Sequence, residues 1–180
     1  MKKLLAAAAL LPTLASAASL LDSTVDVHYH LVNGPDTVNT LDKVVVGAGA
    51  ELSCAGSADL CHALTAPMQS LDFSANAIRY DYAGSGADFL DSTHNWFQFT
   101  SLYGADTAIS GVQLTTNIAG LDASRITFGG HMVRVDMRDL HVDTGAFFQL
   151  GLQTVSPVPE PASTALLLGG LVLIGLWRRR

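Results

Sequence analysis

A strict alternation of apolar and polar residues is the feature that most restricts what this chain can fold into. Residues 24–31 alternate without a break, and shorter copies of the pattern occur at 78–82, 133–137 and 148–152. Successive side chains of a β-strand point to opposite faces, so this period predicts strands that each bury one face. Less regular strands are predicted at 43–46, 71–73, 96–102, 111–115 and 125–128.

Turn-forming residues separate these segments at 33–36, 84–86, 117–120 and 129–130, and the Gly129-Gly130 pair predicts a tight hairpin. No window has the pattern of an amphipathic helix. Some nine short strands at this spacing predict an all-β fold, an antiparallel two-sheet sandwich or jelly roll. The glycine-containing segment 45–52 lacks a Gly-Lys-Ser/Thr ending, so we expect a strand with a bend or bulge there and not a nucleotide-binding loop.

The first 18 residues have the layout of a secretory signal peptide. Met1-Lys2-Lys3 is basic, residues 4–14 are apolar, and residues 15–18 read Ala-Ser-Ala-Ala. We expect the Sec machinery to export the chain and cleavage to follow Ala17 or Ala18. The exported domain is then expected to span residues 19–157.

The last 23 residues combine a rigid tripeptide, an apolar run and a basic end. Pro159-Glu160-Pro161 precedes the uncharged segment 162–177, and Arg178, Arg179 and Arg180 close the chain. A helix over 162–177 would reach about 24 Å, slightly less than the ~30 Å of a hydrocarbon core. A core helix is the alternative for so short a run, but terminal arginines favour a transmembrane helix with the arginines in the cytoplasm as a stop-transfer element.

Residues 158–180 resemble the PEP-CTERM sorting domain of Gram-negative bacteria. The resemblance rests on Pro159-Glu160-Pro161, the Leu/Gly-rich segment and the arginine cluster, in that order. It implies recognition by an exosortase in exopolysaccharide-producing bacteria, a transient inner-membrane anchor with the domain in the periplasm, and a final place at the cell surface or in the extracellular matrix. Both prolines favour an extended backbone that an enzyme can bind. Residues 45–152 also look like the β-rich domains often found ahead of this motif.

Cys54 and Cys61 are the only cysteines of the chain. In an oxidising compartment they are expected to form a disulfide that closes a small loop and stabilises the domain by about 2 kcal/mol. The alternative is a metal site that recruits His62, but two cysteines and one histidine make an incomplete zinc set.

The exported domain is strongly acidic. It holds five of the ten Lys and Arg residues and fifteen of the sixteen Asp and Glu residues, so its formal net charge is 5 − 15 = −10. This charge argues against binding of nucleic acid or anionic lipid. It suits solubility, calcium binding or repulsion from other anionic polymers, and these alternatives stay open.

Several residues could carry chemistry, each with a plainer interpretation. His28 and His30 share one strand face and could bind a metal with His94, His131 or His141, although polar strand faces usually hold solvated histidines. Loop carboxylates are weak candidates for calcium ligands, without the spacing of a calcium loop; they are Asp81, Asp88 and Asp91. Four aromatic residues could stack on sugars or pack in the core: Tyr80, Tyr82, Trp96 and Tyr103.

Three functions follow from these observations. The first is a non-enzymatic surface or matrix protein, associated with exopolysaccharide and requiring no cofactor. The second is a carbohydrate-binding module, assisted by calcium in one variant. The third is a small extracellular hydrolase, for which the sequence holds no Gly-x-Ser-x-Gly motif. An exposed aromatic row would favour the second function, and a pocket of converging ionisable groups would favour the third.

Overall fold

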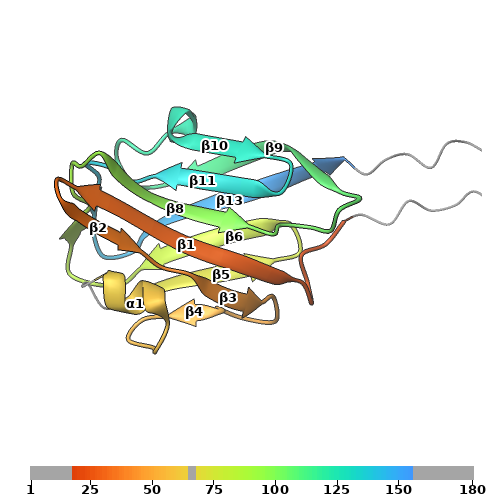
Figure 1. The fold of residues 1–180 in the computed structure, drawn as a ribbon, viewed down its shortest axis with the longest axis horizontal. Helices are drawn as coiled ribbons and strands as arrows, with labels where there is room; N and C mark the ends of the chain where they lie inside the picture. The colour runs from red at the N-terminus through yellow and green to blue at the C-terminus, as the bar shows by residue number, and fades with distance from the viewer. Residues whose placement is uncertain (1–17, 65–67, 156–180) are drawn as a thin grey trace, which may run out of the picture.

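The computed structural model describes residues 18–64 and 68–155, and two antiparallel sheets form the body of the fold (Figure 1). The six-stranded sheet has the order β10–β11–β8–β1–β2, and β3 pairs with the other half of β1. The strand bounds in this sheet are β1 Thr24–Asn33, β2 Asp36–Asn39, β3 Asp42–Val45, β8 His94–Thr100, β10 Ile126–Gly129 and β11 Met132–Asp136.

The five-stranded sheet has the order β4–β5–β6–β13–β9. Its strands are β4 Leu52–Ser53, β5 Gln69–Ser74, β6 Ala77–Tyr82, β9 Ala108–Thr116 and β13 Ala146–Val155. A two-stranded sheet joins β7 Ala87–Asp88 to β12 His141–Val142. The helical elements are short, α1 Asp59–Ala63 and the 3₁₀ turn η1 Ala123–Arg125. An all-β antiparallel fold with almost no helix is therefore confirmed.

The two larger sheets contact each other through aromatic side chains of their inner faces. Phe99 of β8 meets Phe73 of β5 with ring centroids 5.7 Å apart, and Phe97 lies 5.4 Å from Tyr80 and 6.2 Å from Phe148. All five rings are buried. Burial of such rings is the main favourable term for a domain of this kind.

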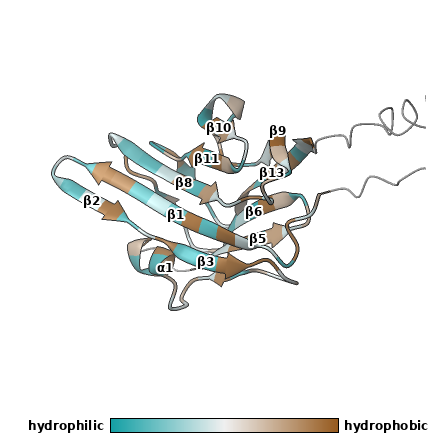
Figure 2. Ribbon diagram, turned by 45° about the vertical axis from the view of Figure 1, so that its right-hand side comes forward, coloured by the Kyte–Doolittle hydropathy of each residue, from teal (hydrophilic) through white to brown (hydrophobic). Residues whose placement is uncertain are grey.

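Alternation along the strands gives each sheet one buried and one outward face, visible as the hydropathy bands along β1 in Figure 2. All nine predicted strands are present, with ends shifted by at most three residues. Glycine occurs in two of the turns. Gly34, at φ +60°, lies in the turn of the β1–β2 hairpin. Gly130 follows β10 in the predicted hairpin between β10 and β11. Strand β2, which begins at the last residue of the predicted turn 33–36, and the two-residue strands β4, β7 and β12 were not expected.

Segment 45–52 is where the prediction needs correction. It is not one bent strand: β3 ends at Val45, the chain bends, and β4 starts at Leu52 in the other sheet. The carboxylate of Glu51 accepts hydrogen bonds from the backbone N–H groups of Gly47 and Phe73, both at 2.8 Å. These bonds stabilise the segment that passes from β3 in one sheet to β4 in the other.

The predicted signal peptide and transmembrane helix lie outside the described residues, apart from Ala18. Leu20 is already fully buried, and its N–H donates to the carbonyl of Ala75 at 2.8 Å, so the packed domain includes it. Within residues 18–64 and 68–155, no helix has the length and apolarity that a membrane crossing needs.

Candidate functional site

The outward face of the six-stranded sheet collects polar and aromatic side chains from three adjacent strands. In the strand register, Trp96 of β8 lies opposite His30 of β1 and Asp136 of β11. One row along, Gln98 lies opposite His28 and Arg134. We call this surface, centred on these six residues, the Trp96 face.

Trp96 is partly exposed and is surrounded by planar groups. The guanidinium carbon of Arg134 lies 4.3 Å from its ring centroid, in a cation–π contact. The imidazole of His30 stacks at 4.9 Å with an angle of 26° between the planes, and His94 approaches at 4.4 Å. Gln98 Oε1 accepts hydrogen bonds from Nε and Nη2 of Arg134, at 3.1 and 2.7 Å, which orients the guanidinium.

Trp96 separates two clefts on this face. One, of about 190 Å³, runs toward β2 and includes His28, His30 and Asn39. The other, of about 320 Å³, runs toward β10 and includes Arg125, Arg134 and Arg138. Because Trp96 lines both clefts, a ligand longer than one sugar ring could contact it while occupying both.

The cleft toward β10 concentrates positive charge. Nη2 of Arg138 lies 2.5 Å from Asp136, and Arg125 reaches the same carboxylate at 4.0 Å. Burial raises the pKa of the Asp136 carboxyl, but the hydrogen bonds from Arg138 outweigh burial and hold that pKa below its usual range. Nη1 of Arg125 also donates to the carbonyl of Arg138 at 2.7 Å. These contacts fix two guanidinium groups around one carboxylate.

The outward face of the five-stranded sheet carries a second stacked arginine. Arg79 of β6 lies 4.4 Å from the ring centroid of Phe147 on β13. Its Nε and Nη2 donate to the two oxygens of Asp81, at 2.7 and 2.6 Å. The hydrogen bonds that Arg79 donates to Asp81 raise the pKa of Arg79, as expected for a neutralised pair. We call this surface (Arg79, Asp81, Phe147 and Gln149) the Phe147 face.

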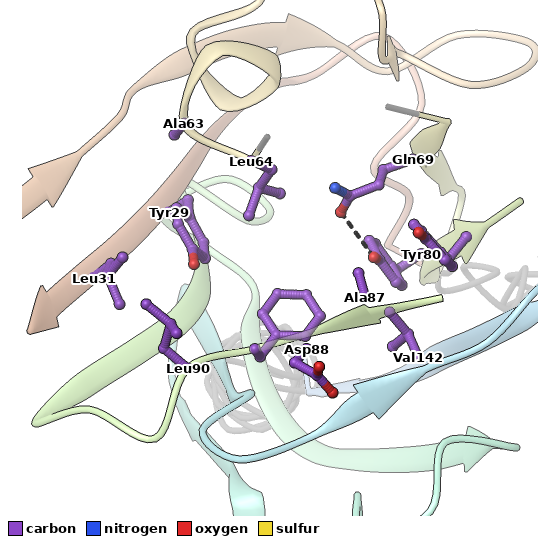
Figure 3. A pocket seen from close by; sticks show the side chains of 12 residues that line it. Tyr29, Leu31, Ala63, Leu64, Gln69, Tyr80, Ala87, Asp88, Leu90 and Val142 are labelled. Atoms are coloured by element: carbon purple, nitrogen blue, oxygen red, sulfur yellow. Dashed lines mark hydrogen bonds between the residues drawn. The ribbon is translucent and has the colours of Figure 1, made fainter. Parts of the chain in front are cut away.

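A pocket of about 240 Å³ opens between the sheets beside the C-terminal end of α1 (Figure 3). Its polar groups bond one another: the hydroxyl of Tyr80 donates to Gln69 Oε1 at 2.7 Å, and that of Tyr29 donates to Asn95 at 2.8 Å. Burial raises the pKa of Tyr29 to about 12, and burial also raises the pKa of Tyr80. Asp88 is the sole carboxylate among the described lining residues, so the pocket does not gather the ionisable groups that a hydrolase would need.

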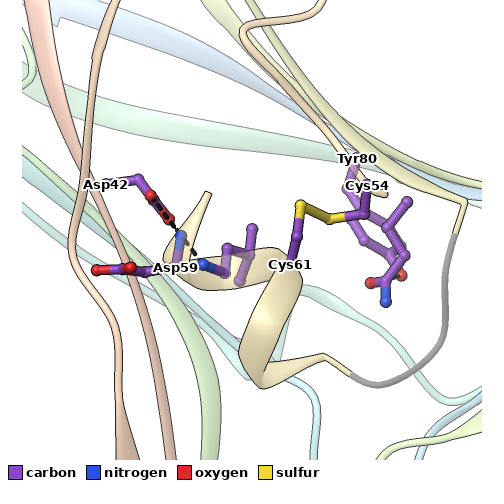
Figure 4. Close-up of a disulfide and its surroundings, with 7 residues drawn as sticks. Asp42, Cys54, Asp59, Cys61 and Tyr80 are labelled. Carbon is purple, nitrogen blue, oxygen red and sulfur yellow. Dashed lines mark hydrogen bonds between the residues drawn. A yellow bond between two sulfur atoms is a disulfide. The ribbon is translucent and has the colours of Figure 1, made fainter. Parts of the chain in front are cut away.

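The predicted disulfide is confirmed: Cys54 and Cys61 are bonded, with Cα atoms 5.2 Å apart (Figure 4). Both sulfur atoms are used, so the alternative metal site with His62 is excluded in this structure. The bridge joins the residue after β4 to α1, and Asp42 accepts hydrogen bonds from the N–H groups of Asp59 and Leu60 at 2.8 Å each. The disulfide and this carboxylate together hold a five-residue helix that is too short to be stable alone.

The structure separates the candidate metal ligands. His30 lies near His94, with ring centroids 5.5 Å apart, while His131 approaches the carbonyl of Leu102 and His141 bonds Asp88 and Asp143. The hydrogen bond to the carboxylate of Asp88 is the main cause of the raised pKa of His141. In the described part of the chain, no three His, Cys, Asp or Glu side chains lie close enough to hold a metal ion. Of the weak calcium candidates, Asp81 pairs with Arg79, Asp88 with His141, and Asp91 lies beside Arg125 and Arg138.

Three of the four candidate sugar-stacking residues belong to the core. Tyr80, Tyr82 and Tyr103 are buried, and the hydroxyl of Tyr103 has no hydrogen-bond partner in the described part of the chain. Trp96 alone of the four reaches the outward surface. Four residues of this surface carry no motif that would mark them in the sequence: Gln98, Arg125, Arg134 and Arg138. The one sequence feature that could have indicated them is the alternation along the strands. It places Trp96 with Gln98, and Arg134 with Asp136, on the outward side of their strands.

Comparison with protein families identifies the tail of the chain. Residues 157–180 match the PEP-CTERM protein-sorting motif. Comparison with curated proteins and with solved structures found no significant match. The chain therefore carries the predicted sorting motif, which lies directly after β13 and implies export, temporary membrane anchoring and processing by an exosortase.

Proposed function

We propose that the protein is a non-enzymatic surface or extracellular-matrix protein that an exosortase processes and releases, and that its β domain associates with exopolysaccharide. The observation that carries the first half is the PEP-CTERM match at residues 157–180. The Sec machinery would export the chain, and the inner membrane would hold it until processing. The periplasm is then the compartment in which the Cys54–Cys61 bridge forms.

Fractionation of tagged variants in native cells tests the sorting. Replacing Pro159 and Pro161 by alanine should leave the chain in the membrane but block its release, because two prolines add little to membrane affinity while they define the extended segment. Deleting Arg178–Arg180 should instead weaken membrane retention, since cytoplasmic cations oppose full translocation. Release of the double-alanine variant at the wild-type rate would refute exosortase processing.

The Trp96 face supports the second half of the proposal and also favours the carbohydrate-binding module as a second candidate. Sugar-binding surfaces combine an aromatic ring with amide, imidazole or guanidinium donors, and this face has all of them around Trp96. Two clefts that meet at one ring suit a polymer better than a small molecule. No catalytic role is assigned to any residue.

Retention on exopolysaccharide from the native cells tests this association. Trp96→Ala should lower the retained fraction severalfold, whereas Phe147→Ala, which removes the stacked ring of the opposite face, should leave it unchanged. Equal retention of both variants would refute the role of the Trp96 face in binding exopolysaccharide. Release of new reducing sugar ends from the polymer by wild-type protein would instead favour the hydrolase.

A further inference from the structure

Three of the five cations of the domain lie around one cleft, although the domain as a whole carries a net charge of −10. Arg125, Arg134 and Arg138 line this cleft together with a single carboxylate, that of Asp136. The formal charge of the lining is therefore 3 − 1 = +2. At physiological ionic strength the Debye length is about 8 Å, so a bound group senses this lining more than the distant acids.

Arg134 is the cation in the cleft that is available to a ligand. Its two hydrogen bonds both go to the neutral Gln98, and Nη1 makes none within the part of the chain that the structure describes. Arg138 and Arg125, by comparison, share the Asp136 carboxylate. A guanidinium that is oriented by an amide but not neutralised can donate to a carboxylate with its remaining N–H groups.

The geometry also indicates where a sugar would lie. The imidazole of His30 stacks on the indole of Trp96 and the Arg134 guanidinium lies over the same indole, and the two clefts extend from Trp96 toward opposite edges of the sheet. A sugar in the cleft toward β10 would contact the accessible part of Trp96 with its own carboxylate beside Arg134. Neutral sugars would gain the contact with Trp96 but not the charged hydrogen bond.

We infer that the Trp96 face binds an anionic polysaccharide of the uronic acid class, with Arg134 donating to the sugar carboxylate. This inference rests on the proposed association with polysaccharide and names its chemical class. It runs against one of the alternatives that the composition leaves open, repulsion from anionic polymers, because the charge of the local cleft has the opposite sign to that of the domain.

The test uses two forms of one polymer. Exported protein, recovered from native cells, is assayed for binding to polygalacturonate and to the same polymer with its carboxylates fully methyl-esterified. Wild type should bind the free acid at least tenfold more tightly than the ester. Arg134→Gln should remove that preference. Arg79→Gln is the matched control, because Arg79 is also stacked on an aromatic ring but is already neutralised by Asp81. Circular dichroism checks that each variant folds.

Each other outcome overturns the inference in its own way. Equal binding of both polymers, lost in Trp96→Ala but kept in Arg134→Gln, would leave the polysaccharide proposal standing and refute the anionic class. An equal loss in Arg79→Gln and Arg134→Gln would indicate diffuse charge and no site. Binding to neither polymer would refute this inference, while fractionation of the tail variants would still decide the sorting.

Discussion

The two outward faces of the domain use the same construction with different electrostatics. Each has an arginine over an aromatic ring, at 4.3 Å for Arg134 on Trp96 and 4.4 Å for Arg79 on Phe147. On the Phe147 face Nε and Nη2 of the arginine donate to the carboxylate of Asp81, but on the Trp96 face the same two nitrogens donate to the amide oxygen of Gln98. One guanidinium is neutralised and the other is not.

The net charge of the domain therefore does not predict the local charge at a site on its surface. Most cations of this acidic domain have a carboxylate beside them: Lys43 pairs with Asp26, Arg79 with Asp81, and Arg138 with Asp136. Such exposed pairs add little to stability, with a median near 0–1 kcal/mol, but they cancel charge locally. The cation without such a pair, Arg134, is the informative one, and it lies on the face with the partly exposed Trp96.

The largest effect is expected where the two faces share support. Phe97 is fully buried and contacts rings of both sheets, so Phe97→Ala should lower the free energy of unfolding by about 3–5 kcal/mol and impair both faces. Urea unfolding followed by circular dichroism measures this loss. Phe128→Ala is the control, because that ring is 43% exposed. Equal costs for the two variants would contradict a core common to both sheets.

The disulfide should separate stability from binding. Cys54→Ser with Cys61→Ser opens a short loop at the β4 edge of the five-stranded sheet, and should cost about 2 kcal/mol. Binding at the Trp96 face should remain, since the bridge lies on the other sheet. Wild type in reductant serves as the control and should unfold like the variant. A loss of polygalacturonate binding in folded variant would show that the two regions are coupled.

Gln98→Glu converts the Trp96 face to the electrostatics of the Phe147 face. It places a carboxylate where Arg134 now donates to an amide, so binding to polygalacturonate should weaken about tenfold, equivalent to about 1.4 kcal/mol. Gln149→Glu is the matched control beside Arg79, whose Nη1 lies 3.4 Å from Gln149 Oε1. Titration of polymer against each variant measures both. Undiminished binding in Gln98→Glu would mean that Arg134 is not the recognising cation.

The reverse exchange should have the smallest effect. Asp81→Asn leaves Arg79 stacked on Phe147 without its carboxylate, and should change the free energy of unfolding by less than about 1 kcal/mol, because Arg79 and Asp81 are 37% and 41% exposed. A weak gain in polygalacturonate binding should accompany it, and the added Arg79→Gln substitution should abolish that gain. If Asp81→Asn gains nothing, an unpaired stacked arginine is not sufficient for recognition.

The strands, the disulfide and the sorting motif could be predicted from the sequence, because each depends on a local pattern or on residue counts. Period-two alternation located the nine strands and their buried faces, because adjacent side chains of a strand must point to opposite sides. Two cysteines in an exported chain left one possible intramolecular bridge, and the tail motif was legible in the order of Pro159-Glu160-Pro161, the apolar run and the arginines.

Which strands are neighbours depends on the tertiary structure, and so does the set of residues that meet in the Trp96 face. Alternation says that Trp96 and Gln98 face outward on one strand and Arg134 on another, but not that these strands pair. Gln98 and Arg134 are 36 residues apart and meet only because β11 aligns beside β8. The short strands β4, β7 and β12 and the helix α1 are likewise products of packing, since segments of two to five residues have too few local interactions to specify a structure alone.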